Sequence, residues 1–312
     1  MITKTAARRD NNHRPWICHI SARKAFESVL KATSCVDGGV LLPAYVGWSA
    51  NEGSGVFDPV AALGLSYSFY RLTDRLEIDL SSLRHALDNG HVRVVVLIHY
   101  FGHVDRFYEE AVHLARARGA LVVEDEAHAL LSDLQGGICG RLGDFAIYSL
   151  HKLLPLRRGG AVIVNTRAMD FFDRFEEGIQ LDVPWYDFDL KVISERRVTN
   201  AVFLDELVRQ TVPEVEPLWG KPRSGEVPQT YPVLVRPGTR DSLYHSMNQR
   251  GFGVVSLYHT LIEQLSAHQY GDAHQVSARI LNLPVHQDIS EAELEAMVGE
   301  LRHQVREPHV IA

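Results

Sequence analysis

Short apolar runs rich in β-branched residues alternate with longer helical patterns between about residues 21 and 165 of the 312-residue chain. This alternation is typical of βαβ units, in which successive strands lie parallel and helices cover the sheet. It predicts an α/β domain with a largely parallel sheet. The expected strands are 40–42, 65–69, 92–99, 121–124, 145–150 and 161–165, and the expected helices are 22–31, 80–87 and 105–118.

The alternation breaks at residues 181–189, LDVPWYDFD, which contain a proline and three aromatic residues. A long helical stretch and mixed elements follow this break. We therefore expect two domains, a large α/β domain over residues 1–190 and a smaller α+β domain over residues 191–312. In the second domain the expected elements are strands at 231–235 and 280–283 and helices at 240–249 and 290–304, with Ser290 and Glu293 placed for a capping box.

The distribution of charged residues and cysteines argues against several classes of protein. The 39 acidic and 32 basic residues are interspersed, and no basic block could follow a phosphate backbone, so no nucleic-acid partner is expected. Cys18, Cys35 and Cys139 are widely spaced, which predicts neither a disulfide framework nor a structural zinc site and fits a reducing cytoplasm. No apolar run approaches the ~20 residues of a membrane helix, and residues 1–14 do not resemble an export signal.

Polar residues that directly follow apolar runs are the candidates for a functional site, because ligands of open α/β sheets bind beyond the carboxyl ends of the strands. A carboxylate at such a buried strand end needs hydrogen bonds or a cationic partner, which a neighbouring lysine could supply. From the residues alone, Asp125 and Lys152 fit a structural ion pair as well as a catalytic pairing. The strand ends with such residues are ALVVED (Asp125), RVVVLIHYFG (His99, Tyr100) and DFAIYSLHK (Ser149, His151, Lys152).

Motifs typical of nucleotide-binding proteins, metal sites and hydrolases are missing from the sequence. The chain has neither GxGxxG nor GxxxxGK[ST], which argues against dinucleotide and P-loop sites. His99 and His103 lie at a strand end that runs into a turn at Gly102, so we expect satisfied histidines and no metal ligands there. Ser149 and His151 lack the GxSxG elbow of a hydrolase.

Seven segments occur in order along nearly the whole chain: SARKAF (21–26), LLPAY (41–45), LIHYFG (97–102), VVEDEAHAL (122–130), GDFAIYSLHK (143–152), GGAVIVN (159–165) and NLPVH (282–286). Together they resemble the sugar-aminotransferase group of fold type I pyridoxal 5'-phosphate (PLP) enzymes, the DegT/DnrJ/EryC1/StrS family. The resemblance implies a large PLP-binding domain, with a mostly parallel sheet flanked by helices, and a smaller C-terminal α+β domain.

The resemblance also implies two catalytic residues. The aspartate of the ED motif, here Asp125, would hydrogen-bond the protonated pyridine nitrogen of PLP and keep the ring cationic. The lysine after the YSL-type strand, here Lys152, would carry the cofactor as a Schiff base and then move the substrate proton. This work requires a lowered lysine pKa, which burial beside a cationic cofactor would provide.

Further cofactor contacts follow from the same resemblance. The helix that begins near Ala22, the Ser149 hydroxyl and Arg23 would hold the phosphate, although Arg23 could equally be a solvated side chain. His128 would lie near the phenolic oxygen of the cofactor, or else be a histidine at a helix start with no ligand contact. Trp48, in preference to Tyr45, would stack on the pyridine ring, and either aromatic could instead belong to the core.

Three features depart from the family pattern. Ser149 and Lys152 are three residues apart, whereas many members have five. Glu126 stands where small residues are usual. Arg157 and Arg158 replace an acidic loop and could meet a substrate carboxylate or phosphate, or simply be solvated.

The leading functional hypothesis is an aminotransferase that moves an amino group from a donor such as glutamate to a ketone such as a keto-sugar. A PLP-dependent lyase, dehydratase, cyclase or decarboxylase would use the same lysine and aspartate, because both stabilise a carbanion at Cα. A non-catalytic regulatory relative would keep the fold without turnover. The family resemblance further implies a homodimer, and we expect a soluble cytoplasmic protein.

Overall fold

The computed structural model describes residues 14–33, 38–181 and 187–306. Cys35, the terminal segment 1–13 and most of the expected domain junction at 181–189 lie outside the described residues.

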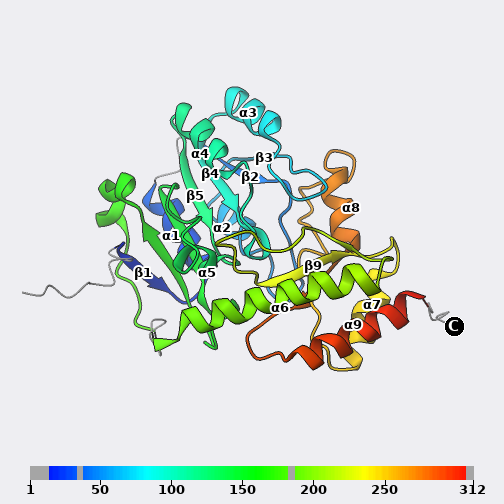
Figure 1. Cartoon of the computed structure of the whole chain (residues 1–312). Coiled ribbons are helices and arrows are strands. Elements are labelled where there is room, and N and C mark those ends of the chain that lie inside the picture. Colours follow the sequence, from blue (N-terminus) through cyan, green and yellow to red (C-terminus); the bar gives the residue numbers. More distant parts are fainter. Residues whose placement is uncertain (1–13, 34–37, 182–186, 307–312) are drawn as a thin grey trace, which may run out of the picture.

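A seven-stranded sheet with the order β1-β7-β6-β5-β4-β2-β3 is the centre of the larger part of the molecule (Figure 1). Neighbours from β3 through β2, β4 and β5 to β6 are parallel, whereas β7 is antiparallel to both β6 and β1. The predicted α/β fold with a largely parallel sheet is therefore confirmed. The strands are β1 (Trp16–His19), β2 (Gly39–Pro43), β3 (Tyr67–Tyr70), β4 (Val92–Ile98), β5 (Leu121–Asp125), β6 (Phe145–Ser149) and β7 (Gly160–Val164).

Helices cover both faces of this sheet, as its apolar strands require. Strands β2, β6 and β7 are buried at every residue. Helix α1 packs on β6 and β7, and helix α4 packs on β5. The helices are α1 (Ala22–Ala32), α2 (Phe57–Ala62), α3 (Leu80–Asn89), α4 (Tyr108–Ala117) and α5 (Leu130–Leu134), with the 3₁₀ segments η3 (Tyr100–Gly102), η4 (Leu150–Lys152) and η5 (Thr166–Arg174).

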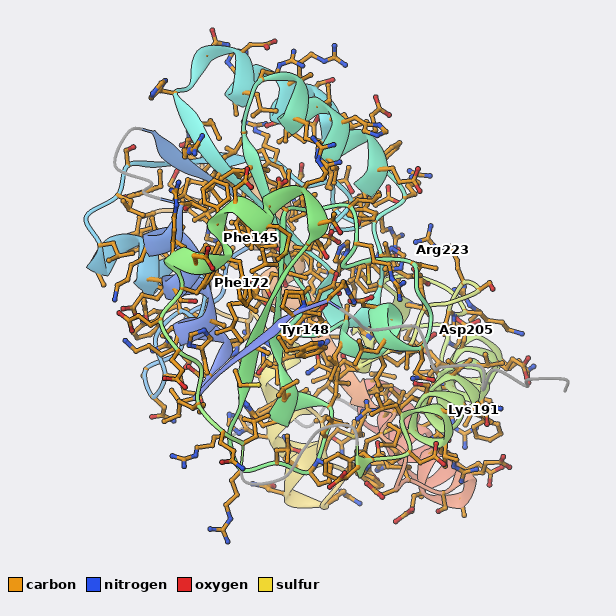
Figure 2. All side chains as sticks on the ribbon, turned by 90° about the vertical axis from the view of Figure 1, so that its left-hand side faces the viewer. Phe145, Tyr148, Phe172, Lys191, Asp205 and Arg223 are labelled. Carbon is orange, nitrogen blue, oxygen red and sulfur yellow. The ribbon has the colours of Figure 1, made fainter. Side chains whose placement is uncertain are left out.

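A three-stranded antiparallel sheet, β10-β9-β8, lies in the C-terminal part of the chain with its own apolar core. Figure 2 shows Phe145 and Tyr148 on the large sheet, and Lys191 and Asp205 on the long helix α6. Helices α6 and α7 both pack against α9. The elements are α6 (Leu190–Thr211), β8 (Glu216–Pro217), β9 (Thr230–Leu234), α7 (Arg240–Gln249), α8 (Gly271–Arg279), β10 (Ile280–Pro284) and α9 (Glu291–Arg306).

Helix α9 begins with the predicted capping box. The Ser290 Oγ atom accepts the backbone N–H of Glu293 at 3.3 Å, and the Glu293 carboxylate accepts the backbone N–H of Ser290 at 2.8 Å. The division into domains at residues 190 and 191 stays a prediction.

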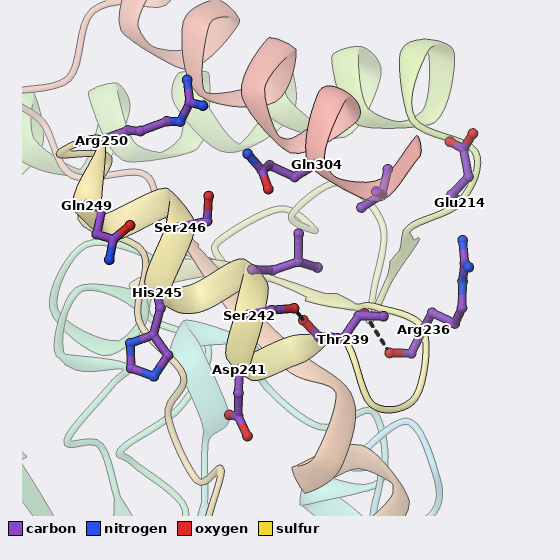
Figure 3. A pocket seen from close by; sticks show the side chains of 12 residues that line it. Glu214, Arg236, Thr239, Asp241, Ser242, His245, Ser246, Gln249, Arg250 and Gln304 are labelled. Atoms are coloured by element: carbon purple, nitrogen blue, oxygen red, sulfur yellow. Dashed lines mark hydrogen bonds between the residues drawn. The ribbon is translucent and has the colours of Figure 1, made fainter. Parts of the chain in front are cut away.

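A surface hollow lies between α7 and the end of α9 in this C-terminal part, and Figure 3 shows its polar lining. Arg236, Asp241, His245 and Arg250 are among the side chains around it. None of the residues predicted to bind the cofactor or act in catalysis lines this hollow, so the candidate site lies elsewhere.

Several element boundaries differ from the sequence expectation. The strand expected at 65–69 runs from Tyr67 to Tyr70, because its parallel pairing with β2 starts at Tyr67 opposite Val40. The helix expected from residue 105 begins at Tyr108, since the Asp105 carboxylate is held by the backbone N–H groups of Phe107 and Ile78. The short elements β1, α2, α5, β8 and α8 were not predicted. Among the described residues, no helix is both long and apolar enough to cross a membrane.

Candidate active site

A cavity of about 560 Å³ lies at the carboxyl edge of the parallel strands. Four parts of the chain form its walls: the start of α1, residues 46–56 after β2, the ends of β5 and β6 with η4, and residues 256–259 between α7 and α8. All seven residues predicted to bind the cofactor or act in catalysis line this one cavity: Ala22, Arg23, Trp48, Asp125, His128, Ser149 and Lys152.

Asp125 is the last residue of β5 and is almost fully buried at the cavity wall. Its Oδ1 atom accepts the backbone N–H of Ala127 at 2.9 Å. Burial raises the pKa of Asp125, and this hydrogen bond and the charge of Lys152 offset the effect only in part. Among the described residues no ion pair joins Asp125 to Lys152, so the structural ion-pair interpretation finds no contact to support it.

Lys152 ends the 3₁₀ turn η4, which directly follows β6, and its side chain lines the cavity. Although Lys152 is exposed toward the open cavity, desolvation by the surrounding chain lowers the pKa of its amine, and the negative charges of Asp125 and Glu52 oppose the shift. The short spacing between Ser149 and Lys152 therefore still brings both residues to the same cavity.

His128 connects Lys152 to the backbone at Phe101. The His128 Nδ1 atom accepts the N–H of Phe101 at 3.2 Å, so the proton of the neutral ring resides on Nε2. That Nε2 atom lies 2.9 Å from Lys152 Nζ, and an Nε2–H donor requires the unprotonated lysine as acceptor. Burial is the main cause that lowers the pKa of His128, and it keeps the ring neutral. The contacts of His128 thus favour a neutral Lys152 amine.

The backbone at Phe101 has an unusual conformation that supports this contact. Phe101 has φ of 56°, in the left-handed region that non-glycine residues rarely occupy. Its ring stacks on the His128 ring, with 5.5 Å between centroids and an interplanar angle of 13°. The strained backbone and the stacked ring together hold His128 in one orientation.

We predict that His128→Ala will raise the pH at which Lys152 becomes reactive, because the neutral amine loses its hydrogen-bond donor and the ammonium gains solvent. The measurement is the rate at which added PLP attaches to Lys152 of the cofactor-free protein, followed by borohydride reduction and peptide mapping across a pH series. His151→Ala is the matched control, since His151 also lines the cavity but its ring contacts Ser149 and Gly159. An equal shift in both variants would mean that hydration of the cavity, and not the His128 contact, controls the amine.

The start of α1 presents backbone N–H groups to the cavity. Ser21 caps the helix by accepting the N–H of Lys24 at 3.3 Å, and Ala22 lines the cavity. A Cβ atom at Gly160 of β7 would collide with the Ala22 nitrogen, so only glycine permits this close packing. Ser149, buried at the end of β6, faces the same space. A helix start with a nearby hydroxyl is suited to an anion such as phosphate.

Arg23 is held in place by acidic and carbonyl oxygens. One guanidinium nitrogen lies 3.4 Å from Asp58 Oδ2, and the other donates to the backbone carbonyl of Glu52. The side chain is therefore neither freely solvated nor unpaired. Arg157 and Arg158 are not among the described residues that line the cavity.

The two aromatic candidates have different surroundings. Trp48 lines the cavity and is 46% exposed, whereas Tyr45 is fully buried and packs on Tyr100 and Tyr258. The structure thus places Tyr45 in the core, and Trp48 remains the aromatic available for stacking.

Sequence reasoning missed the contribution of the segment 256–259. Tyr258 brings its ring between Tyr45 and Phe101 and reaches the cavity across Gly47, where a Cβ atom would lie 2.7 Å from the Tyr258 ring. Tyr258 also has a positive φ of 58°. No local pattern marks this segment, because its ring contacts are with residues far away in the sequence.

Comparison with known proteins identifies the segment that carries Asp125 and Lys152. Residues 19–170 match the model of the DegT/DnrJ/EryC1/StrS aminotransferase family. This segment belongs to that family. The predicted resemblance is therefore confirmed over the part of the chain that forms most of the cavity.

The individual proteins that resemble this chain are distant from it in sequence. GDP-perosamine synthase from Escherichia coli O157:H7 is 28% identical over 100 residues, which are 31% of this chain and 26% of that relative. The match thus spans about a quarter of the relative's length. Two solved structures share the fold over most of the chain.

The first is the aminotransferase TlmJ from Streptoalloteichus hindustanus, with a TM-score of 0.73, 20% identity and coverage of 93% of this chain and 86% of that one. The second is the sugar aminotransferase CalS13 from Micromonospora echinospora, with a TM-score of 0.70, 17% identity and coverage of 92% and 87%.

Proposed function

We propose that this chain is a PLP-dependent aminotransferase that moves an amino group from an amino-acid donor to a ketone, such as a keto-sugar. The observation that carries this proposal is the meeting of Asp125 and Lys152 at one cavity, at the ends of the adjacent strands β5 and β6. The family match over residues 19–170 and the names of the relatives support the same reaction class and a sugar-derived acceptor.

The residues around the cavity fit PLP. Asp125 is a buried carboxylate whose described hydrogen-bond donor is a single backbone N–H, so a protonated ring nitrogen would supply the cation it lacks. The N-terminus of α1 and Ser149 fit the phosphate, and Trp48 fits a ring face. When bound, the cofactor supplies an electron sink for the carbanion at the substrate Cα.

Each residue then has a defined task. Lys152 Nζ would hold the cofactor covalently, and its free amine would take the proton from the substrate Cα and deliver it to the C4' carbon of the cofactor. His128 orients Nζ and favours its neutral form through the 2.9 Å contact. Asp125 would accept a hydrogen bond from the protonated ring nitrogen and keep its positive charge compensated.

We further propose that the protein acts as a homodimer in the cytoplasm. Trp48 supports the dimer, since this aromatic ring at the cavity is 46% exposed in the single chain and a second copy would cover it. Light scattering after size exclusion tests the dimer: a mass twice that of the 35.0 kDa chain is expected, and a monomer at all concentrations would contradict it.

The experiment that tests the PLP proposal is an absorption spectrum of the purified, PLP-loaded protein before and after borohydride, followed by peptide mapping. We expect a visible or near-ultraviolet band that borohydride removes, with the reduced cofactor on Lys152. A donor screen with glutamate and other amino acids then measures transfer to a ketone. A protein that takes up no PLP would contradict the enzymatic proposal and favour a non-catalytic relative.

A further inference from the structure

We propose a second site in this protein, a structural zinc site formed by His99, Glu126 and Cys139. Their ligand atoms all lie within 4.8 Å of one another, and each side chain is buried. His99 follows β4, Glu126 follows β5, and Cys139 comes from the loop before β6. An imidazole, a carboxylate and a thiol are the three donor types that bind zinc in proteins.

Glu126 is the fully buried carboxylate of this cluster, and the imidazole of His99 lies 3.4 Å from its Oε1 atom without forming a hydrogen bond. Its Oε1 atom has no hydrogen-bond partner, and its Oε2 atom receives only the Cys139 thiol at 3.2 Å, which is a weak donor. A fully buried carboxylate without strong donors is costly, so its charge must be neutralised by a proton, on Glu126 itself or on the neighbouring His99, or by a metal ion.

Two neighbouring buried acids, Asp133 and Glu124, have the hydrogen-bond or ion-pair partners that Glu126 lacks. Asp133 is paired with Arg14 at 2.7 Å and with Arg141 at 3.2 Å. Glu124 accepts the backbone N–H of Gly140 at 2.6 Å and that of Gly143. Asp133 and Glu124 therefore have partners that stabilise their charges. Glu126, which lies beside the histidine and the thiol, has only the weak thiol donor.

The two Glu126 oxygens face different partners, one the His99 nitrogen and the other the Cys139 sulfur. In a tetrahedral zinc site the N to O edge is about 3.3 Å and the S to O edge about 3.5 Å, from bond lengths of about 2.0–2.3 Å. His99 Nε2 lies 3.4 Å from Glu126 Oε1, and Cys139 Sγ lies 3.2 Å from Glu126 Oε2. Glu124 Oε2, also 3.4 Å from His99 Nε2, is the oxygen placed to become a fourth ligand.

A metal here would connect the ends of β4 and β5 to the loop that precedes β6. Asp125 lies between Glu124 and Glu126 and faces the cavity, so the zinc site would brace the strand end that carries it. The sequence predicted no metal ligand at His99, which lies at a strand end that runs into a turn, and no structural zinc site from the widely spaced cysteines.

The test is the metal content of the full-length, tag-free protein from cells grown with added zinc and purified without chelators. We expect about one zinc per chain, and a fall to background in Glu126→Gln and in Cys139→Ala. Cys18→Ala is the matched control and should retain its zinc, because Cys18 is a half-buried thiol outside the cluster. Refolding with Co²⁺ in the absence of PLP should give a thiolate-to-cobalt absorption band that Cys139→Ala lacks.

Glu126→Gln separates the proposal from the alternative that Glu126 is a protonated acid. Glutamine copies the neutral acid in shape, so this variant folds normally if a proton occupies the site. A wild-type protein that contains no zinc would overturn the proposal, as would zinc that remains equal in the wild type and both cluster variants. Neither outcome bears on PLP binding, which the absorption experiment tests separately.

Discussion

Lys152→Ala will lower the rate of amino transfer by at least about 10³-fold, since the variant loses both the covalent anchor and the base that moves the proton at Cα. It will also lose the borohydride-trapped adduct, while noncovalent binding of PLP through the other cavity residues persists. The measurement is single-turnover transfer from the amino donor, together with peptide mapping after reduction.

Lys191→Ala is the matched control for this loss. Lys191 lies on α6, is strongly exposed and faces Glu195 at 3.8 Å, so its removal should change neither transfer nor trapping. Circular dichroism establishes that both variants are folded. If Lys152→Ala retained a tenth of the activity, or if the cofactor were trapped on another lysine, the proposed role of Lys152 would be wrong.

Asp125→Asn will lower transfer by about 10²–10³-fold, the range measured when one charge-stabilising group is removed from an active site. The change is nearly isosteric, and the asparagine oxygen can still accept the N–H of Ala127. What disappears is the negative charge that keeps the ring nitrogen protonated. The absorption spectrum of the bound cofactor and the rate constant for transfer measure this effect.

Asp144→Asn is the control for the loss of a buried aspartate. Asp144 accepts the N–H of Val122 at 2.8 Å at the opposite end of β5, away from the cavity. We expect this variant to lose stability, by about 1–3 kcal/mol for a weakened buried hydrogen bond, with little change in transfer. Equal losses of activity in the two variants would show that Asp125 acts through the fold and not through the cofactor.

The alternation of apolar runs and helical patterns predicted the large sheet correctly. Of the polar residues at the strand ends, Asp125, Ser149, His151 and Lys152 line the cavity, whereas His99 and Tyr100 do not. Both signals are local. A strand buried on both faces must be continuously apolar, and the topology of parallel strands brings their carboxyl ends to one edge. The amino-acid sequence alone was therefore enough to select Asp125, Ser149 and Lys152 as residues of this cavity.

The sequence left open which of the possible neighbours each of these side chains contacts. The left-handed backbone of Phe101, its N–H bond to His128, the placement of Tyr45 in the core and the entry of Tyr258 from residues 256–259 all depend on packing between distant segments. The cluster of His99, Glu126 and Cys139 is of the same kind. Periodicity reports whether a residue is buried, whereas the partners of a buried polar group depend on how the complete chain packs, so only the tertiary structure decided them.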